Sequence, residues 1–362
     1  MYMERAFLNF IQYCIDENKE VPASLGEIDW DLFLAFAKKQ AILGVVFQGM
    51  QRLGPGENRP SKELIYQWFS MSEQIKRRNQ KLNAAVVEVS KRLLEDGFPH
   101  CILKGQGNAV MYPNPYMRTS GDIDIWLDGS RKRIVDYVRG NHMEEGICYH
   151  HIEARMSGQW VELHFIPSYF NNPFYNRRLQ KWFSQQKKQQ FGNEVDLPDG
   201  GGKIFVPTIE FNVVYQLCHL MYHFFAEGIG LRQMMDYYFL LKRRGECPEK
   251  NEDLQRLLKY LGLYRFAGAV MYVEKELLGL EEKYMIVPVQ KRKGEMLQEE
   301  ILRGGNFGKF DTKYDMSHRS TAKTYFSKIY RNLHFIREYA GEALCEPIFR
   351  TGHFVWRLWN RK

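Results

Sequence analysis

Apolar residues recur at helical spacing through the first 95 residues of the chain. Residues 6–15 hold apolar pairs three or four positions apart, which places them on one face of a helix. A second helical pattern starts after Asp29, a residue type that caps helix N-termini. Gly54-Pro55-Gly56 breaks the chain before a longer pattern over 62–95. The N-terminal region is therefore predicted to be helical.

Between residues 96 and 207 the pattern changes to the two-residue alternation that is typical of strands. The segments predicted as strands are 99–103, 122–127, 147–152 and 159–165. Ser157-Gly158 is a turn signal before the last of them, and three consecutive glycines indicate a hairpin over 195–206. A short helix is predicted over 131–139.

Helical spacing returns after Pro207, with Thr208 as a predicted cap. The segments predicted as helices are 208–226, 230–245, 249–262, 264–279, 322–340 and 345–360. The fold class expected from this order is α+β, with a small mixed β-sheet core flanked by helices. We expect an N-terminal helical region (1–95), an α/β core (96–207) and a C-terminal helical region (208–362).

The composition indicates an ordinary globular protein, with 44% hydrophobic and 26% charged residues. The six cysteines are scattered without a CxxC pair, so neither a disulfide framework nor a cysteine metal site is expected. The most apolar stretch, 211–225, is too short and too polar to cross a bilayer, and the N-terminus lacks an apolar signal core. A cytoplasmic location is the resulting expectation.

The net charge of +8 is concentrated near the C-terminus, where residues 317–362 hold nine Lys/Arg against three acids. A basic face of this kind suits either the phosphates of a nucleotide or polynucleotide, or a merely solvated helical surface. The sequence leaves both interpretations open.

The pair Asp122 and Asp124 is the most informative feature for chemistry. In a strand, residues two apart project from one face, so both carboxylates would point the same way, with Ile123 and Ile125 buried behind them. Neighbouring carboxylates repel each other, and a shared cation is a physical reason for placing them together. Mg²⁺ takes hard oxygen ligands of this type together with substrate phosphates.

Other residues complete a predicted site around the acid pair. Glu162 and His164 share one face of a second strand, so Glu162 could supply a third acid as metal ligand or general base; Glu153 is a weaker competitor. Lys104 and Gly105, at the end of the first strand, are expected at nucleotide phosphates. The same contact is expected of three residues just before the acid pair: Arg118, Ser120 and Gly121.

These motifs, in this order, resemble the uncharacterised nucleotidyltransferases of the polymerase-beta-like superfamily, in the branch with Lys-Gly where Gly-Ser is usual. The resemblance is carried by Leu103-Lys104-Gly105, Tyr112-Pro113, the segment 118–125, Val161-Glu162-Leu163-His164, His219-(x)3-His223, the segment 230–236 and the segment 305–308. It covers most of residues 30–310 and is most specific over 103–124.

The resemblance implies a mixed sheet with flanking helices and transfer of a nucleoside monophosphate from an NTP such as ATP, with pyrophosphate release. It implies dependence on Mg²⁺ or Mn²⁺, with Asp122, Asp124 and Glu162 as metal ligands and Lys104 and Gly105 at the phosphates. The absent Gly-Ser pair leaves the details of the phosphate loop open, and the third acid is one methylene longer than the usual Asp.

Several alternatives remain at this point. The acceptor hydroxyl could belong to a small molecule, a protein or an RNA end, and the chain could instead be an inactive nucleotide- or RNA-binding module that retains the fold. His219 and His223 are expected to pack beside the site, and Arg232 and Asp236 could form an ion pair within one helix. His150-His151 is expected on a hairpin surface rather than in the cleft.

Overall fold

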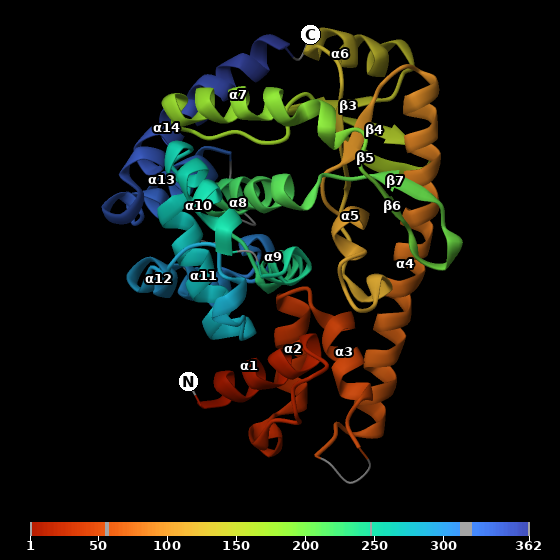
Figure 1. Ribbon diagram of the computed structural model, residues 1–362, viewed down its shortest axis with the longest axis vertical. Helices are drawn as coiled ribbons and strands as arrows, with labels where there is room; N and C mark the ends of the chain where they lie inside the picture. Colours follow the sequence, from red (N-terminus) through yellow and green to blue (C-terminus); the bar gives the residue numbers. More distant parts are fainter. Residues whose placement is uncertain (1, 55–57, 247, 312–320, 361–362) are drawn as a thin grey trace.

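Helices surround one small mixed sheet in the computed structural model, which describes residues 2–54, 58–246, 248–311 and 321–360 (Figure 1). The sheet lies between the long helix α4 (Lys62–Glu95) on one side and the C-terminal helices on the other. The α+β fold class is confirmed, since a mixed sheet core stands between helical regions that precede and follow it.

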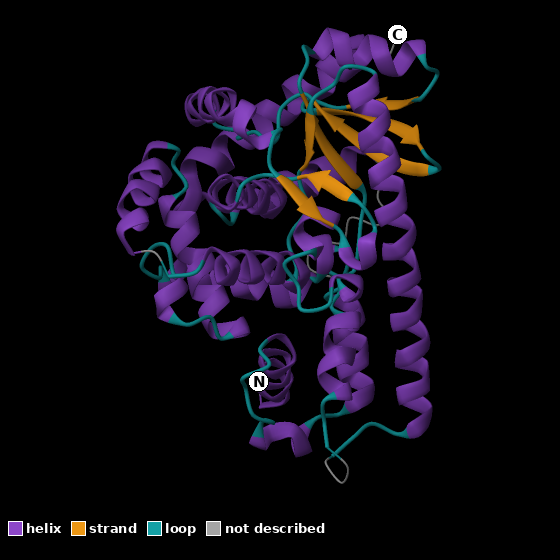
Figure 2. Ribbon diagram, turned by 45° about the vertical axis from the view of Figure 1, so that its right-hand side comes forward, coloured by secondary structure: helices purple, strands orange, loops and turns teal. Residues whose placement is uncertain are grey.

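The main sheet has the strand order β1-β2-β5-β4-β3, and Figure 2 shows the strands in orange among the helices. Its strands are β1 (His100–Ile102), β2 (Ile123–Leu127), β3 (Glu144–Ile147), β4 (His151–Met156) and β5 (Gln159–His164). Strands β2 and β5 pair in parallel, while the other neighbours pair antiparallel. The parallel pair joins two strands that are separated along the chain by α6 (Arg131–Gly140) and the β3–β4 hairpin.

One face of the sheet is apolar and closes a small core. Ile123, Ile125 and Leu163 on this face are almost fully buried, and they pack with the C-terminal half of α4 and with α6. Because alternate residues of a strand point to opposite faces, this burial directs the polar residues of β2 and β5 to the other side. That second face is the one that meets the C-terminal helices.

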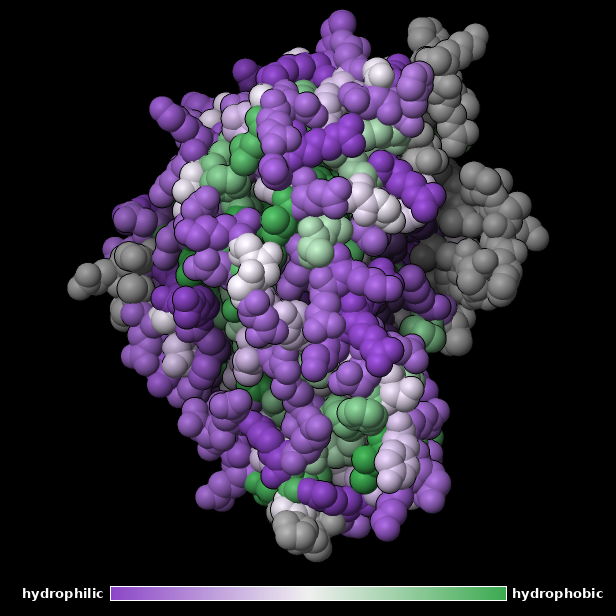
Figure 3. Space-filling view, turned by 90° about the vertical axis from the view of Figure 1, so that its right-hand side faces the viewer, coloured by the Kyte–Doolittle hydropathy of each residue, from purple (hydrophilic) through white to green (hydrophobic). Residues whose placement is uncertain are grey.

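Helix α4 begins at the cap Ser61, whose hydroxyl accepts from the Leu64 amide. Its first half packs with the N-terminal helices α1 (Tyr2–Ile15), α2 (Trp30–Lys39) and α3 (Leu43–Gln51). The surface seen from the α4 side is mostly hydrophilic, with apolar side chains scattered over it (Figure 3). Helix α4 therefore connects two clusters of buried side chains and keeps a polar outer face.

The C-terminal layer is built around α8 (Ile209–Ala226) and α9 (Leu231–Arg244), which are buried along most of their length. Around them lie α7 (Pro173–Gln190), α10 (Pro248–Tyr260), α11 (Tyr264–Leu278), α12 (Lys291–Gly304), α13 (Thr321–Leu333) and α14 (Ile336–Asn360). A short hairpin, β6 (Glu194–Asp196) with β7 (Lys203–Phe205), precedes α8. No helix among the described residues is both long and apolar enough to span a membrane.

Most predicted elements are confirmed, and three differences have physical reasons. The strand predicted over 147–152 is divided, because Ile147 ends β3, His151 begins β4, and the chain turns between them where the Cys148 amide donates to the His151 carbonyl at 2.9 Å. Helix α7 was not predicted because its 18 residues are rich in Lys and Gln and bury few apolar side chains. Helix α12 was not predicted because its buried face includes the charged residues Lys293 and Glu300, whose charges are paired with Glu338 and Arg331.

Candidate functional site

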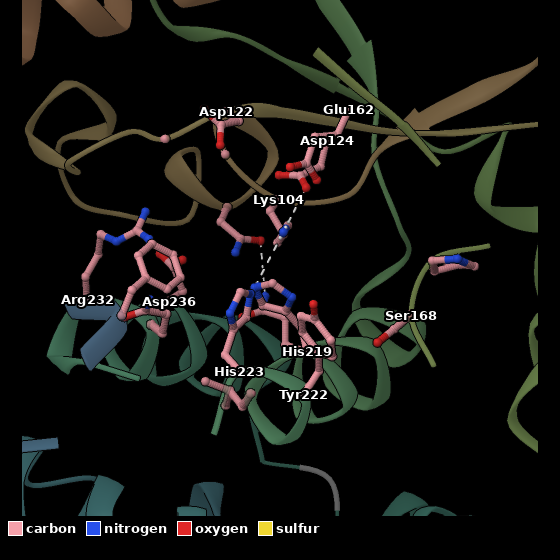
Figure 4. A pocket seen from close by; sticks show the side chains of 18 of the residues that line it. Lys104, Asp122, Asp124, Glu162, Ser168, His219, Tyr222, His223, Arg232 and Asp236 are labelled. Atoms are coloured by element: carbon pink, nitrogen blue, oxygen red, sulfur yellow. Dashed lines mark hydrogen bonds and ion pairs between the residues drawn. The ribbon is translucent and has the colours of Figure 1, made fainter. Parts of the chain in front are cut away.

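A pocket of about 380 Å³ lies between the polar face of the sheet and helices α8 and α9. Figure 4 shows Asp122, Asp124 and Glu162 on the sheet side, facing His219, Tyr222 and His223 of α8 across the pocket. Seven of the eight residues predicted for the site line this pocket. Those seven are Lys104, Gly105, Arg118, Gly121, Asp122, Asp124 and Glu162.

Ser120 is the exception. It is not among the residues that line the pocket, and its buried hydroxyl has no hydrogen-bond partner among the described residues. The phosphate contact of Ser120 stays a prediction.

Asp124 and Glu162 stand side by side on the parallel strands β2 and β5, in direct register. One oxygen of each carboxylate lies within 4.8 Å of the other and of a His164 ring nitrogen. Asp124 is 6% exposed, so its charge is held in a poorly solvated position. The predicted pairing of the two strands brings these two acids together.

Asp122 is placed differently from the prediction. Strand β2 begins at Ile123, so Asp122 precedes the strand, and its side chain is exposed at the pocket edge. Its carboxylate is not part of the group formed by Asp124, Glu162 and His164. It is still close enough to interact: partial burial, followed by the charges of Glu162 and Asp124, raises the pKa of Asp122.

Lys104 lies against the acid pair. Its Nζ is 2.8 Å from Oδ1 of Asp124 and 3.5 Å from Nε2 of His219. Burial alone would raise the pKa of Asp124, but Lys104 and the hydrogen bond from His164 outweigh it and hold that pKa well below its usual value. Asp124 is thus ionised, and its carboxylate attracts a cation to the position that the Lys104 ammonium occupies.

Gly105 follows Lys104 with φ 57° and ψ −114°, a conformation that L side chains rarely adopt. This backbone turns the chain from β1 into the short helix α5 (Gln106–Ala109) and keeps Lys104 beside the acids. Glycine is required here for its backbone angle rather than for space, since an added Cβ would meet its nearest atom at an ordinary 3.5 Å.

Arg118 is buried, at 3% exposure, and is engaged by Asp236 of α9. Its Nε and Nη2 donate to the two carboxylate oxygens at 2.6 and 2.7 Å, and the Tyr112 hydroxyl donates to the same carboxylate at 2.7 Å. Burial would raise the pKa of Asp236, yet Arg118 outweighs it and lowers that pKa. The charge of Arg118 is therefore already balanced, and its visible task is to tie the loop before Asp122 to α9.

Arg232 is the arginine of this pocket whose charge is not balanced. The predicted pair with Asp236 does not form, and no carboxylate of the described chain lies within ion-pair distance of Arg232. Its Nη1 donates to the carbonyl of Thr119 at 3.2 Å, its Nε donates to Asn306, and the guanidinium lies over the Phe307 ring. Burial, followed by the charge of Arg118, lowers the pKa of Arg232 to about 10.

Two further histidines on α8 belong to the same wall. His219 faces Lys104, and the Nδ1 atom of His223 is 2.6 Å from Oε1 of Glu227. Burial, followed by the charges of Lys104 and His223, lowers the pKa of His219 well below its usual value. The expectation that His219 and His223 lie beside the site is thus met by their position on the pocket wall.

Three other imidazoles, of His150, His151 and His164, gather on the sheet side of the pocket. We call them the imidazole cluster; one nitrogen of each lies within 4.8 Å of the others. The expectation that His150-His151 lies on a hairpin surface is wrong, because β4 begins at His151 and turns it toward Glu162. Burial lowers the pKa of His151 to about 4, while hydrogen bonds to Asp124 and Glu162 overcome burial and raise the pKa of His164.

The basic C-terminal segment contributes less free charge than its sequence suggests. Arg331 is buried and paired with Glu300 at 3.1 Å, and Arg350 pairs with Glu346. Arg319, Arg361 and Lys362 lie outside the described residues. The Arg331–Glu300 pair joins α13 to α12, whereas the Arg350–Glu346 pair lies within α14.

The segments that carried the family resemblance meet at this one pocket. His219, Arg232, Asp236 and Phe307 come from distant parts of the chain, yet all line it. Sequence reasoning assigned Arg232 only an ion pair with Asp236 and assigned Phe307 no role, and their place in the shared motifs was the signal that could have brought them to the site.

Residues 26–279, more than two-thirds of the chain, match the protein family described as uncharacterised nucleotidyltransferase. No curated protein matches the chain. Among solved structures, the chain is similar to an antigenic nucleotidyltransferase-like protein from Paracoccidioides brasiliensis, with a TM-score of 0.36 and 14% sequence identity, over 59% of this chain and 97% of that chain.

Proposed function

Because the chain belongs to the family of uncharacterised nucleotidyltransferases, we propose that it transfers a nucleoside monophosphate from an NTP to an acceptor hydroxyl, with release of pyrophosphate. The observation that carries this proposal is the in-register pair of Asp124 and Glu162, which faces a pocket large enough for a nucleotide. The resemblance indicated by the motifs is confirmed by the family match.

The acids fit a divalent cation. Asp124 is ionised, and the pKa of Asp122 is raised in part by the charges of Asp124 and Glu162, so negative charge is concentrated at this edge of the sheet. Hard carboxylate oxygens suit Mg²⁺ or Mn²⁺. We assign Asp122, Asp124 and Glu162 to hold this cation, which when bound would stabilise charge on the attacking and leaving oxygens.

Two basic residues are assigned to the phosphates of the nucleotide. Lys104 already lies at the acid pair, and we propose that it leaves Asp124 for a phosphate oxygen when the cation takes its place. Arg232 is the second, because this buried guanidinium has no carboxylate of the described residues within ion-pair distance, and such a group favours an anionic ligand. Gly105 and Gly121 complete the wall where the backbone borders the nucleotide, while Arg118 positions the loop.

The test is pyrophosphate release from each of the four labelled NTPs, with Mg²⁺ or with a chelator, in the presence of a cell extract that supplies acceptors. The fraction that gains label then identifies a small molecule, a protein or an RNA as the acceptor. We expect release that depends on the metal and is lost in Asp124→Asn. The matched control is Asp128→Asn, since Asp128 lies just after the same strand but pairs with Lys187 outside the pocket.

Release that continues in the chelator, or an Asp124→Asn variant as active as Asp128→Asn, would overturn the proposal. Binding of an NTP without any release in every extract would favour an inactive nucleotide-binding module instead.

A further inference from the structure

The imidazole cluster is not used by the proposed transfer reaction. His151 at the start of β4 lies directly opposite His164 at the end of β5, in the antiparallel register of these strands. His150 adjoins them, and its backbone carbonyl accepts from the Phe165 amide at 2.8 Å, which fixes its place beside β5. The sheet itself therefore holds three imidazoles together.

Four donor atoms of this region follow one another at nearly equal distances. Nε2 of His150 is 3.3 Å from Nδ1 of His151, which is 3.4 Å from Oε2 of Glu162. That oxygen is in turn 3.3 Å from Nε2 of His164. The four atoms thus define three contacts of 3.3 to 3.4 Å.

These distances match a tetrahedral metal shell. Zinc binds histidine nitrogen at about 2.0–2.1 Å and carboxylate oxygen at about 2.0–2.2 Å. The edge of a tetrahedron is about 1.63 times its centre-to-vertex length, so neighbouring ligands of zinc lie roughly 3.3–3.4 Å apart. The three contacts therefore match three of the six edges of such a tetrahedron, and the three imidazoles offer nitrogens that lie within 4.8 Å of one another.

Burial removes two of the three imidazoles from solvent. His151 is 7% and His164 is 2% exposed, and three buried nitrogens of the cluster have no hydrogen-bond partner among the described residues: Nδ1 of His150, Nε2 of His151 and Nδ1 of His164. Each of these is the ring nitrogen that takes no part in the three contacts above. The one on His151 lies 4.0 Å from Oε1 of Glu153, the type of outer carboxylate that orients a metal-bound histidine.

We propose that His150, His151, His164 and Glu162 form a binding site for a transition-metal ion of the Zn²⁺ class. Three imidazole nitrogens select such an ion over Mg²⁺, which prefers oxygen ligands. The site goes beyond the proposed transfer reaction, and it adjoins the acid pair because Glu162 belongs to both. A purely hydrogen-bonded imidazole network is the competing explanation, and it predicts no metal affinity.

The test uses the full chain, stripped with a chelator and then titrated with Zn²⁺ against a chromogenic competitor. We expect one zinc per chain, a thermal midpoint that rises with zinc concentration, and strong visible absorption of the tetrahedral type with Co²⁺ in place of zinc. His150→Ala should weaken zinc binding on the order of 100-fold or more, since even outer partners of metal ligands are worth roughly 10- to 100-fold.

His219→Ala is the matched control, because His219 is a half-buried histidine of the same pocket that lies outside the cluster. It should bind zinc as the unaltered protein does. Circular dichroism of both variants without metal shows whether each is folded. If His150→Ala does not fold, His150→Gln takes its place, because it retains a side chain of similar length.

Two more variants separate this proposal from the transfer reaction. Asp124→Asn should lose transfer and retain zinc, whereas Glu162→Gln should weaken both. Absence of zinc binding by the unaltered protein, or equal loss in His150→Ala and His219→Ala, would overturn the metal site while leaving the transfer assay untouched.

Discussion

Replacing Lys104 with methionine should make the free protein bind a divalent cation more tightly. In the structure the Lys104 ammonium lies 2.8 Å from Oδ1 of Asp124, in a position where the aspartate is 6% exposed. A cation at Asp124 has to displace this ammonium. Hydrogen bonds that involve charged groups contribute about 1.5–3 kcal/mol, which corresponds to an increase in metal affinity of about 10- to 150-fold when the lysine is absent.

The opposite change is expected for the nucleotide. If Lys104 moves to a phosphate oxygen once the metal is bound, Lys104→Met should weaken NTP binding while it strengthens binding of the metal alone. Titration with Mn²⁺, followed by electron paramagnetic resonance, measures the first quantity, and titration with an NTP at saturating Mn²⁺ measures the second. Lys187→Met is the matched control, because Lys187 pairs with Asp128 at 2.5 Å outside the pocket. Unchanged or weaker Mn²⁺ binding in Lys104→Met would refute the idea that lysine and metal compete for Asp124.

Three other predictions concern the scaffold. Asp236→Asn leaves Arg118 buried without its carboxylate partner, which costs about 3–5 kcal/mol. With an unfolding entropy of about 2.1 cal/mol/K for each of the 362 residues, the thermal midpoint should fall by about 4–7 °C. Adding Arg118→Met should restore most of this loss. Gly105→Ala should cost about 1–3 kcal/mol in chemical denaturation because of its positive φ, whereas alanine at Gly192, which has open space and no positive φ, should be nearly neutral. Burial raises the pKa of Glu342 to about 7 from 4.5, so its contribution to stability is complete below pH 4.5 and is lost as pH rises through 7. The free energy of unfolding of Glu342→Gln should therefore exceed that of the unaltered protein by about 3 kcal/mol at pH 8 and equal it near pH 4. A difference between the two proteins that does not change with pH would contradict this.

The sheet side of the site could be predicted from the sequence because its signals are local. Asp124 lies in a strand whose alternation is visible over six residues, and Glu162 lies in a second strand of the same kind. Asp122 shows the limit of that reasoning: the alternation includes it, but pairing of β2 begins only at Ile123, so its carboxylate is placed at the edge of the pocket.

The helical side could not be predicted from local patterns. Arg118 pairs with Asp236 across 118 positions of the chain, and this long-range pair excludes the one expected within α9 between Arg232 and Asp236. Spacing of three or four residues permits an ion pair on a helix, but a buried fork of two hydrogen bonds is stronger than such a contact. The division of the chain at residues 95 and 207 stays a prediction, and α4, which ends at Glu95, contributes to both buried clusters.

The two walls of the pocket differ in charge, and this difference bears on the choice between a nucleotide and a polynucleotide. The sheet wall presents Asp124 and Glu162, and the helical wall presents Arg232, which has no ion-pair partner among the described residues. A polynucleotide carries only negative charge and would favour an exposed basic surface, yet Arg331 of the basic segment is buried against Glu300. A metal-bound triphosphate offers positive charge to the acids and negative charge to the arginine at once. The arrangement of charge therefore supports the proposed nucleotide over a polynucleotide, and we expect NTP affinity to depend on Arg232.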